Sequence, residues 1–149
     1  MPFPYTVLTG SEAQTEEVGR ALGQQLLEEG EDEAFLAMYG DLGAGKTALV
    51  RGLAAVVTPG AAVCSPTYTI VNEYRGAGRL LCHFDMYRIE SEEDLDSIGF
   101  YDYGGMIVAE WCENIPFALP ASYYRITIEK CGEDSRRITV EAVNGADRN

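Results

Sequence analysis

Residues 40–47 read Gly40-Asp41-Leu42-Gly43-Ala44-Gly45-Lys46-Thr47. This stretch fits the pattern Gly, four residues, Gly-Lys-Ser/Thr, which is typical of a loop that binds phosphate. Its glycines let the backbone wrap closely around an oxyanion, so that successive N–H groups point inward. We expect Lys46 to neutralise the β- and γ-phosphates of a nucleotide and the Thr47 hydroxyl to ligate magnesium.

The residues on either side of this loop supply the context that the motif requires. An apolar run of buried-strand type, residues 34–39, comes directly before it. Residues 46–57 have apolar side chains at helical spacing and are followed by Pro59-Gly60, which ends the helix. Strand, glycine loop and helix in this order favour a nucleoside triphosphate site over the alternative, a flexible glycine-rich turn with an incidental lysine.

The composition is that of a globular protein whose surface is acidic. The chain has 149 residues, 46% of them hydrophobic, and a net charge of −13 from 24 acidic and 11 basic side chains. We expect a single domain over residues 1–149, with a loose tail at 144–149. No apolar run has membrane-spanning length, and the first residues lack the layout of a signal peptide.

The acidic surface repels nucleic acid, so a role in RNA biology would require a protein partner. Alternatively, the acidity only confers solubility.

The cysteines give a prediction about the compartment. Four of them are widely spaced, at positions 64, 82, 112 and 131, with no close pair that resembles a zinc or redox motif. Buried or partly buried free thiols in a cytoplasmic protein are the expected interpretation.

The rest of the chain alternates strand and helix signals. Ser11 to Gln14 has the spacing of a capping box and predicts a helix over residues 12–28, and Ser91 predicts a short helix that ends by Gly99. Strands are predicted at 5–9, 62–64, 69–74, 79–85, 106–110, 123–130 and 136–143, with hairpins at 69–85 and 123–143.

Two acidic residues close predicted strands and are candidates for the metal site. In open α/β sheets the ligand site lies beyond the carboxyl ends of the strands. Asp85 and Glu110 each occupy such an end. Either could ligate the metal directly or through water while the other orients the attacking water, and spacing alone does not rank them. The alternative is that both are solvated strand ends.

Four other residues have both a structural and a functional interpretation. His83, the only histidine, is expected to be a structural side chain with its hydrogen bonds satisfied; the alternative is a catalyst. Trp111, the only tryptophan, is expected to pack in the core; the alternative is a place near the site or on a partner. Thr67 and Thr69 belong to a loop stiffened by Pro66. They form either an ordinary turn or a segment that lies over the γ-phosphate and senses it.

Four blocks together resemble the TsaE (YjeE) family of small bacterial ATPases. They are GDLGAGKT at 40–47, SPTYTIVNEY at 65–74, HFDMYRI at 83–89 and Ala-Glu-Trp at 109–111. The resemblance implies a P-loop NTPase-like α/β fold in three layers, with a central mixed, mainly parallel sheet flanked by helices, plus β-hairpins. It also implies ATP and magnesium as ligands and a role in making N6-threonylcarbamoyladenosine in ANN-decoding tRNAs. It further implies an ATPase that is weak alone and works with TsaD and TsaB, with tRNA contacted only through the complex.

The resemblance also implies residue roles. Lys46 and Thr47 would hold phosphate and magnesium, Glu110 would be the metal ligand and Asp85 the second catalytic acid. Thr67 would belong to a switch-like loop, and Glu12 and Thr15 would lie near the base. Nucleotide contacts are further implied for the loop residues Asp41, Leu42, Gly43, Ala44 and Gly45 and for Ala48. Many relatives have a second threonine at position 48, so the α-phosphate contacts would be weaker here.

Three functions follow from these observations. The first is an ATPase that resets or drives a tRNA-modifying complex, with low activity alone because no arginine occupies an obvious finger position; Arg51 and Arg88 are candidates only by proximity. The second is a nucleotide-gated binding module in which hydrolysis is incidental. The third is a small-molecule kinase. An Arg-rich lid segment would support it, and the sequence has none. The sequence has no Asn-Lys-x-Asp segment, which reads guanine, so a GTPase is less favoured.

Overall fold

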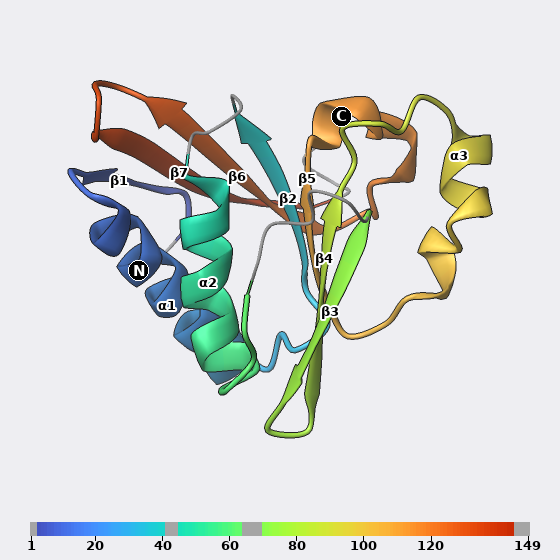
Figure 1. The fold of residues 1–149 in the computed structure, drawn as a ribbon, viewed down its shortest axis with the longest axis horizontal. Helices are drawn as coiled ribbons and strands as arrows, with labels where there is room; N and C mark the ends of the chain where they lie inside the picture. The colour runs from blue at the N-terminus through green and yellow to red at the C-terminus, as the bar shows by residue number, and fades with distance from the viewer. Residues whose placement is uncertain (1–2, 41–44, 64–69, 145–149) are drawn as a thin grey trace.

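The computed structural model describes residues 3–40, 45–63 and 70–144 (Figure 1). Its helices are α1 (Glu12–Glu28), α2 (Lys46–Val57) and α3 (Glu92–Ser97). Three short 3₁₀ turns follow α3, at Phe100–Asp102, Cys112–Asn114 and Pro116–Ala118. Its strands are β1 (Tyr5–Thr9), β2 (Phe35–Gly40), β3 (Val71–Gly76), β4 (Arg79–Asp85), β5 (Met106–Glu110), β6 (Tyr123–Lys130) and β7 (Arg136–Val143).

All seven strands form one mixed sheet in the order β1-β7-β6-β2-β5-β4-β3. The four strands in the middle, β6, β2, β5 and β4, run parallel to one another, whereas β7, β1 and β3 add antiparallel pairings at the two sides. The α/β fold with a mixed sheet, helices and two hairpins is therefore confirmed. Because β2, β4 and β5 are parallel neighbours, their carboxyl ends meet at one edge of the sheet.

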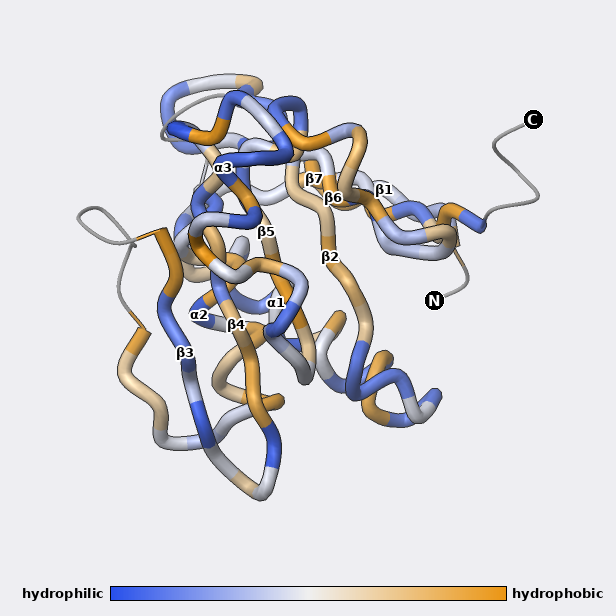
Figure 2. Tube along the Cα trace, turned by 90° about the vertical axis from the view of Figure 1, so that its right-hand side faces the viewer, coloured by the Kyte–Doolittle hydropathy of each residue, from blue (hydrophilic) through white to orange (hydrophobic). Residues whose placement is uncertain are grey.

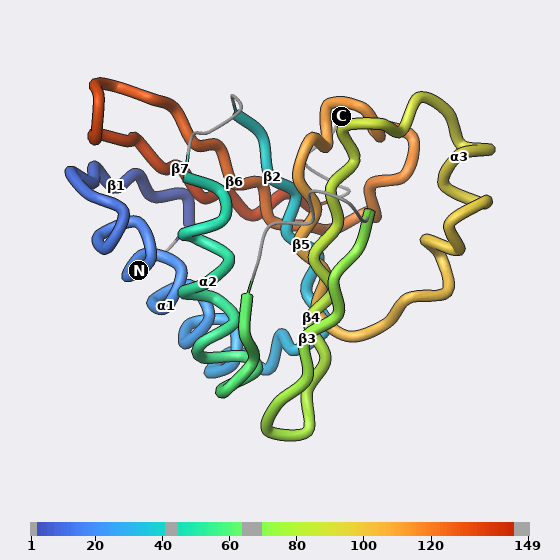
Figure 3. The backbone as a smooth tube through the Cα atoms, viewed as in Figure 1, coloured from blue at the N-terminus to red at the C-terminus, as the bar shows by residue number. Residues whose placement is uncertain are grey.

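The two predicted hairpins lie at opposite ends of the molecule. Figure 3 traces the turn between β3 and β4 to the bottom of the view and the turn between β6 and β7 to the top. The second turn is at the same end as the carboxyl end of β2, because β6 runs parallel to β2. This placement brings Arg136, at the start of β7, close to Gly45, the residue before α2.

Helices α1 and α2 cover one face of the sheet and pack against each other closely. Ser11 caps α1 by accepting a hydrogen bond from the backbone N–H of Gln14 at 3.1 Å, as the capping-box pattern predicts. At the crossing, a Cβ added to Gly52 would overlap the Glu16 carbonyl, and one added to Gly19 would overlap that of Leu49. The backbones can approach this closely only because both positions lack a side chain.

Alternation along the strands separates two hydrophobic cores. One core lies between the sheet and α1 and α2 and includes Leu36, Leu53 and Val108. The other lies on the opposite face, under α3 and the 3₁₀ turns, and includes Phe84 and Ala109. Figure 1 shows α1 and α2 on one side of β4 and β5 and α3 on the other, and Figure 2 shows hydrophobic residues along much of β4. The three layers are thus unequal, with long helices on one face only.

Three predictions need correction or fall outside this description. Ala62 and Val63 do not form a strand; Val63 packs, partly buried, against the first core, and no ladder pairs with this segment. Cys131 is exposed rather than buried, because it lies in the β6–β7 turn, while Cys82 and Cys112 are buried and free. Residues 64–69, including Cys64, Thr67 and Thr69, lie outside the described residues. Within the described ranges, no helix is long and apolar enough to cross a membrane.

Candidate functional site

A cavity of about 520 Å³ opens at the edge of the sheet where β2, β4 and β5 end. Every predicted site residue that the structure describes lines this cavity: Glu12, Thr15, Gly45, Lys46, Thr47, Ala48, Asp85 and Glu110. The other predicted contacts, Asp41, Leu42, Gly43, Ala44 and Thr67, lie outside the described residues. The tertiary structure therefore gathers side chains from α1, α2, β4 and β5 around one space.

Lys46 begins α2 and has an unusual environment for an ammonium group. Gly45, at φ 95°, takes the left-handed conformation that glycine tolerates, and its carbonyl accepts the N–H of Leu49 at 3.2 Å. Lys46 is only 5% exposed, and its Nζ has no hydrogen-bond partner within the described part of the chain. Burying a charge without a partner is costly, so the ammonium is suited to an anionic ligand at the start of a helix.

The ring of Trp111 lies beside this ammonium. Lys46 Nζ is 4.2 Å from the ring centroid, within cation–π range. Trp111 has φ 61° and ψ 41°, a left-handed conformation that is rare for a bulky residue, and its ring meets that of Tyr87 edge-on at 5.1 Å. The expectation of core packing is therefore incomplete, because this half-buried ring touches both the second core and the cavity.

Glu110, at the end of β5, is held by His83. Glu110 is 8% exposed, and its Oε2 lies 2.5 Å from Nε2 of the fully buried His83. In the parallel β4–β5 ladder His83 pairs with Val108 and Asp85 with Glu110, so His83 and Glu110 are diagonal neighbours on one face. His83 is buried, as expected, but only one of its ring nitrogens has a partner, since its Nδ1 has none among the described atoms.

Asp85, at the end of β4, is held differently, by its own backbone turn. Its Oδ1 accepts the N–H of Tyr87 at 3.0 Å, and its backbone N–H donates to the Ile70 carbonyl at 2.8 Å. Asn114 Nδ2 donates to the carbonyls of Met86 at 2.9 Å and Tyr87 at 3.2 Å, which ties down the segment after β4. The two carboxylates therefore sit at paired positions with one oxygen each already engaged.

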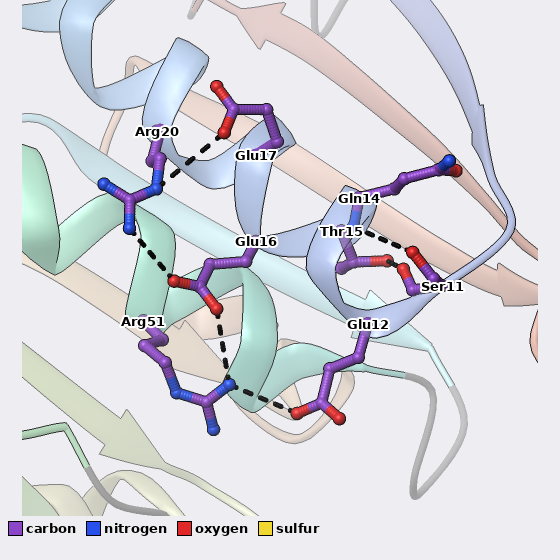
Figure 4. Close-up of polar contacts among 8 residues, drawn as sticks. All are labelled: Ser11, Glu12, Gln14, Thr15, Glu16, Glu17, Arg20 and Arg51. Carbon is purple, nitrogen blue, oxygen red and sulfur yellow. Dashed lines mark hydrogen bonds and ion pairs between the residues drawn. The ribbon is translucent and has the colours of Figure 1, made fainter.

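The first turn of α1 contributes two cavity residues whose polar groups have partners. Thr15 Oγ1 lies 2.8 Å from Thr9 Oγ1 and donates to the Ser11 carbonyl at 3.3 Å. Glu12 pairs with Arg51 Nη1 at 3.2 Å, and Arg51 is also 3.6 Å from Glu16 (Figure 4). Solvent-accessible ion pairs of this kind add little stability, but they hold the Arg51 side chain against Glu12 and Glu16 of α1.

Sequence reasoning missed three residues that line the cavity: Ser11, Asp134 and Arg136. Arg136 begins β7, and its Nη1 donates to the Ser135 carbonyl at 2.9 Å. Neither Arg51 nor Arg88 is among the lining residues. No local pattern marks Arg136, because its proximity to the phosphate loop depends on β6 lying beside β2.

The donors at this site suit magnesium when it arrives with a triphosphate. Thr47, Asp85 and Glu110 supply a hydroxyl and two carboxylates, all oxygen donors, to one cavity. Among the described residues no group of three or more His, Cys, Asp and Glu side chains forms a complete metal cage. Magnesium usually keeps several waters and takes one or two carboxylates plus substrate phosphates, so this partial set fits it.

Comparisons with known proteins agree on one family. The family model described as "Threonylcarbamoyl adenosine biosynthesis protein TsaE" matches residues 9–138. A Bacillus subtilis (strain 168) protein is 40% identical over 109 residues, covering 72% of this chain and 69% of the relative. A Haemophilus influenzae relative is 35% identical over 135 residues, covering 88% of this chain and 85% of its own length. Both relatives carry the name tRNA threonylcarbamoyladenosine biosynthesis protein TsaE.

A solved structure has the same fold. The crystal structure of Bacillus subtilis YdiB superposes with a TM-score of 0.71 at 27% sequence identity, covering 99% of this chain and 91% of that one.

Proposed function

The chain belongs to the TsaE family, and we propose that it is the ATP-binding and ATP-hydrolysing subunit for N6-threonylcarbamoyladenosine modification of ANN-decoding tRNAs. The observation that carries this proposal is Lys46, a buried ammonium without a hydrogen-bond partner in the described chain, at the start of α2 and beside two carboxylates. A triphosphate would supply the anionic partner of Lys46, and its divalent cation would supply the partner of the two carboxylates.

The residues of the cavity have separate roles in the transfer of a phosphoryl group to water. Lys46 stabilises the negative charge on the transferring phosphoryl group, and the α2 N-terminus adds its dipole. Thr47 and Glu110 would hold magnesium, which would supply positive charge to offset that of the phosphates. Asp85 then has the free oxygen that orients the attacking water. Arg136 adds a second cation at the rim, near the start of β7.

The acidic surface supports an indirect role in tRNA recognition. With 24 acidic and 11 basic side chains the surface as a whole repels the phosphate backbone of tRNA, so a TsaD-like and a TsaB-like partner would make the contacts with tRNA. We propose that the isolated chain hydrolyses ATP slowly and that the partners complete the site. Equal turnover by the chain alone and by the reconstituted complex would contradict this part.

The test of the site is the substitution Lys46→Ala. Loss of a charge-assisted contact to phosphate should weaken ATP binding about 10- to 100-fold, measured by calorimetry with magnesium present. Lys130→Ala is the matched control, since Lys130 is the only other lysine and lies exposed at the end of β6. Equal affinities of the two variants, or no heat of ATP binding by the unaltered chain, would overturn the proposal.

A second substitution separates hydrolysis from binding. Glu110→Gln keeps the shape of the side chain but removes its charge, so ATP should still bind while hydrolysis falls about 100-fold or more. If this variant sustains repeated rounds of tRNA modification in the reconstituted complex, the chain acts as a nucleotide-gated binding module and hydrolysis is incidental.

A further inference from the structure

Among the described residues His83 makes a single polar contact, although it lies in the interior of the protein. It is fully buried on β4, its Nε2 contacts Glu110 Oε2 at 2.5 Å, and its Nδ1 has no partner among the described residues. Burying a ring nitrogen without a hydrogen bond costs free energy, which an apolar side chain of similar size would avoid. Packing alone therefore does not account for a histidine here, and the contact with Glu110 is the feature that does.

The direction of this hydrogen bond follows from the chemistry of the partner. A carboxylate that ligates a cation only accepts hydrogen bonds, so in that state the Nε2–H of His83 donates a hydrogen bond to Oε2 of Glu110. The other ring nitrogen, Nδ1, is the one without a partner among the described atoms. This arrangement leaves the second oxygen of Glu110, Oε1, for the cavity.

The contact restricts a side chain that would otherwise be free to rotate. Glutamate has three rotatable side-chain bonds, one more than aspartate, and the neighbouring Asp85 is already held by the Tyr87 N–H at 3.0 Å. Within the described part of the chain no backbone N–H donates to the Glu110 carboxylate; it is anchored across the strands by a rigid ring on β4. Ligands held by a second hydrogen-bonding residue in this way are oriented before the metal arrives, and loss of that residue typically weakens metal binding 10- to 100-fold.

We propose that His83 is a positioning residue that fixes the Glu110 carboxylate in the orientation that binds the divalent cation of the nucleotide complex. The proposal rests on the proposed function, because it requires the nucleotide site at Lys46 and Thr47. It assigns His83 no contact with the nucleotide or with the reacting atoms.

The test measures metal affinity rather than turnover. MgCl₂ is titrated by calorimetry into the full chain saturated with ADP, and ADP binding is measured separately without metal. His83→Leu should raise the magnesium concentration for half-saturation about 10- to 100-fold and leave metal-free ADP affinity unchanged. His83→Gln should restore most of the loss, because its amide nitrogen reaches the place of Nε2. His83→Asn should not, because its shorter amide reaches only the place of Nδ1.

A double-mutant cycle with Glu110→Ala gives the decisive result. If His83 acts only through Glu110, adding His83→Leu to Glu110→Ala should cause no further loss of magnesium affinity. Cys82→Ala is the control for disturbing β4, since Cys82 is buried on the opposite face and should leave magnesium affinity unchanged. If the leucine variant does not fold, the comparison of the glutamine and asparagine variants, both polar, still decides the question.

Three results would overturn the inference: equal magnesium affinity of the His83→Gln and His83→Asn variants, losses from His83→Leu and Glu110→Ala that multiply, or a loss of metal-free ADP binding in His83→Leu. These differ from failure of the proposed function, in which the unaltered chain itself would bind no ADP.

Discussion

The two faces of the central sheet carry different kinds of side chain on the same strands. On the face toward α1 and α2, β4 and β5 end in Asp85 and Glu110, with His83 behind them. On the other face, their alternate residues Phe84 and Ala109 lie in a closed apolar core under α3. Because side chains alternate along a strand, the same two strands supply the carboxylates of the cavity on one face, called here the reactive face, and part of a hydrophobic core on the other, called the closed face. The comparison predicts that substitutions at the strand-end residues of the first face change binding, whereas substitutions in the core of the second face change stability and leave binding intact.

The largest expected effect is on the closed face. Phe84 is fully buried, and its ring meets those of Phe100 and Tyr103 at 5.1 and 5.0 Å. Phe84→Ala should lower the free energy of unfolding by about 3–5 kcal/mol, measured by urea denaturation, because it leaves a cavity in the core. Below the unfolding transition, ATP affinity should stay near that of the unaltered chain; a large loss in the folded protein would show that the faces are not independent. Phe117→Ala, at a half-exposed ring, is the control.

Gly52→Ala should disturb the helices that cover the reactive face. The new Cβ overlaps the Glu16 carbonyl, so α1 and α2 must separate, and overpacking of this kind costs about 1–3 kcal/mol of unfolding free energy. Thermal denaturation measures the loss. Gly104→Ala has open space around its Cβ and should change stability by no more than about 0.5 kcal/mol. Equal melting temperatures for the two variants would refute the close approach of the helices.

Arg136→Ala tests the rim of the reactive face. Removing one cation from the edge of a phosphate site should weaken ATP binding about 10-fold, with little change in stability. The control is Arg137→Ala, the next residue of β7, which is exposed and pairs with Glu129 at 3.1 Å. If both variants bind ATP as the unaltered chain does, Arg136 lies near the phosphates without contacting them.

Thiol labelling is the mildest probe of the same comparison. Burial raises the pKa of Cys82 to about 11 and that of Cys112 to about 12, so at pH 8 both remain protonated and enclosed. The exposed Cys131 should therefore react first with a maleimide in a Cys64→Ser background, as peptide mass spectrometry would show. Cys82 and Cys112 should react only after unfolding; rapid labelling of either in the native protein would mean that the closed face opens readily.

Local patterns predicted the phosphate loop and most of the elements. The capping box at Ser11, the helical spacing of residues 46–57 and the alternation of the two hairpins all correspond to elements of the structure. The strand predicted at Ala62 and Val63 was wrong, because β-rich composition does not by itself provide a neighbouring strand to pair with. Asp85 and Glu110 were correctly brought to one cavity, because both follow strands whose carboxyl ends meet.

The sequence by itself was enough to predict a nucleotide site made of a glycine loop, a lysine and two strand-ending acids, since backbone freedom, charge and spacing are local properties. Only the tertiary structure decided that His83 holds Glu110, that Trp111 covers Lys46 and that Arg136 reaches the cavity from the far end of the chain. These contacts depend on strand order and register, which arise when distant segments pair. A sequence pattern with a range of a few residues cannot contain them.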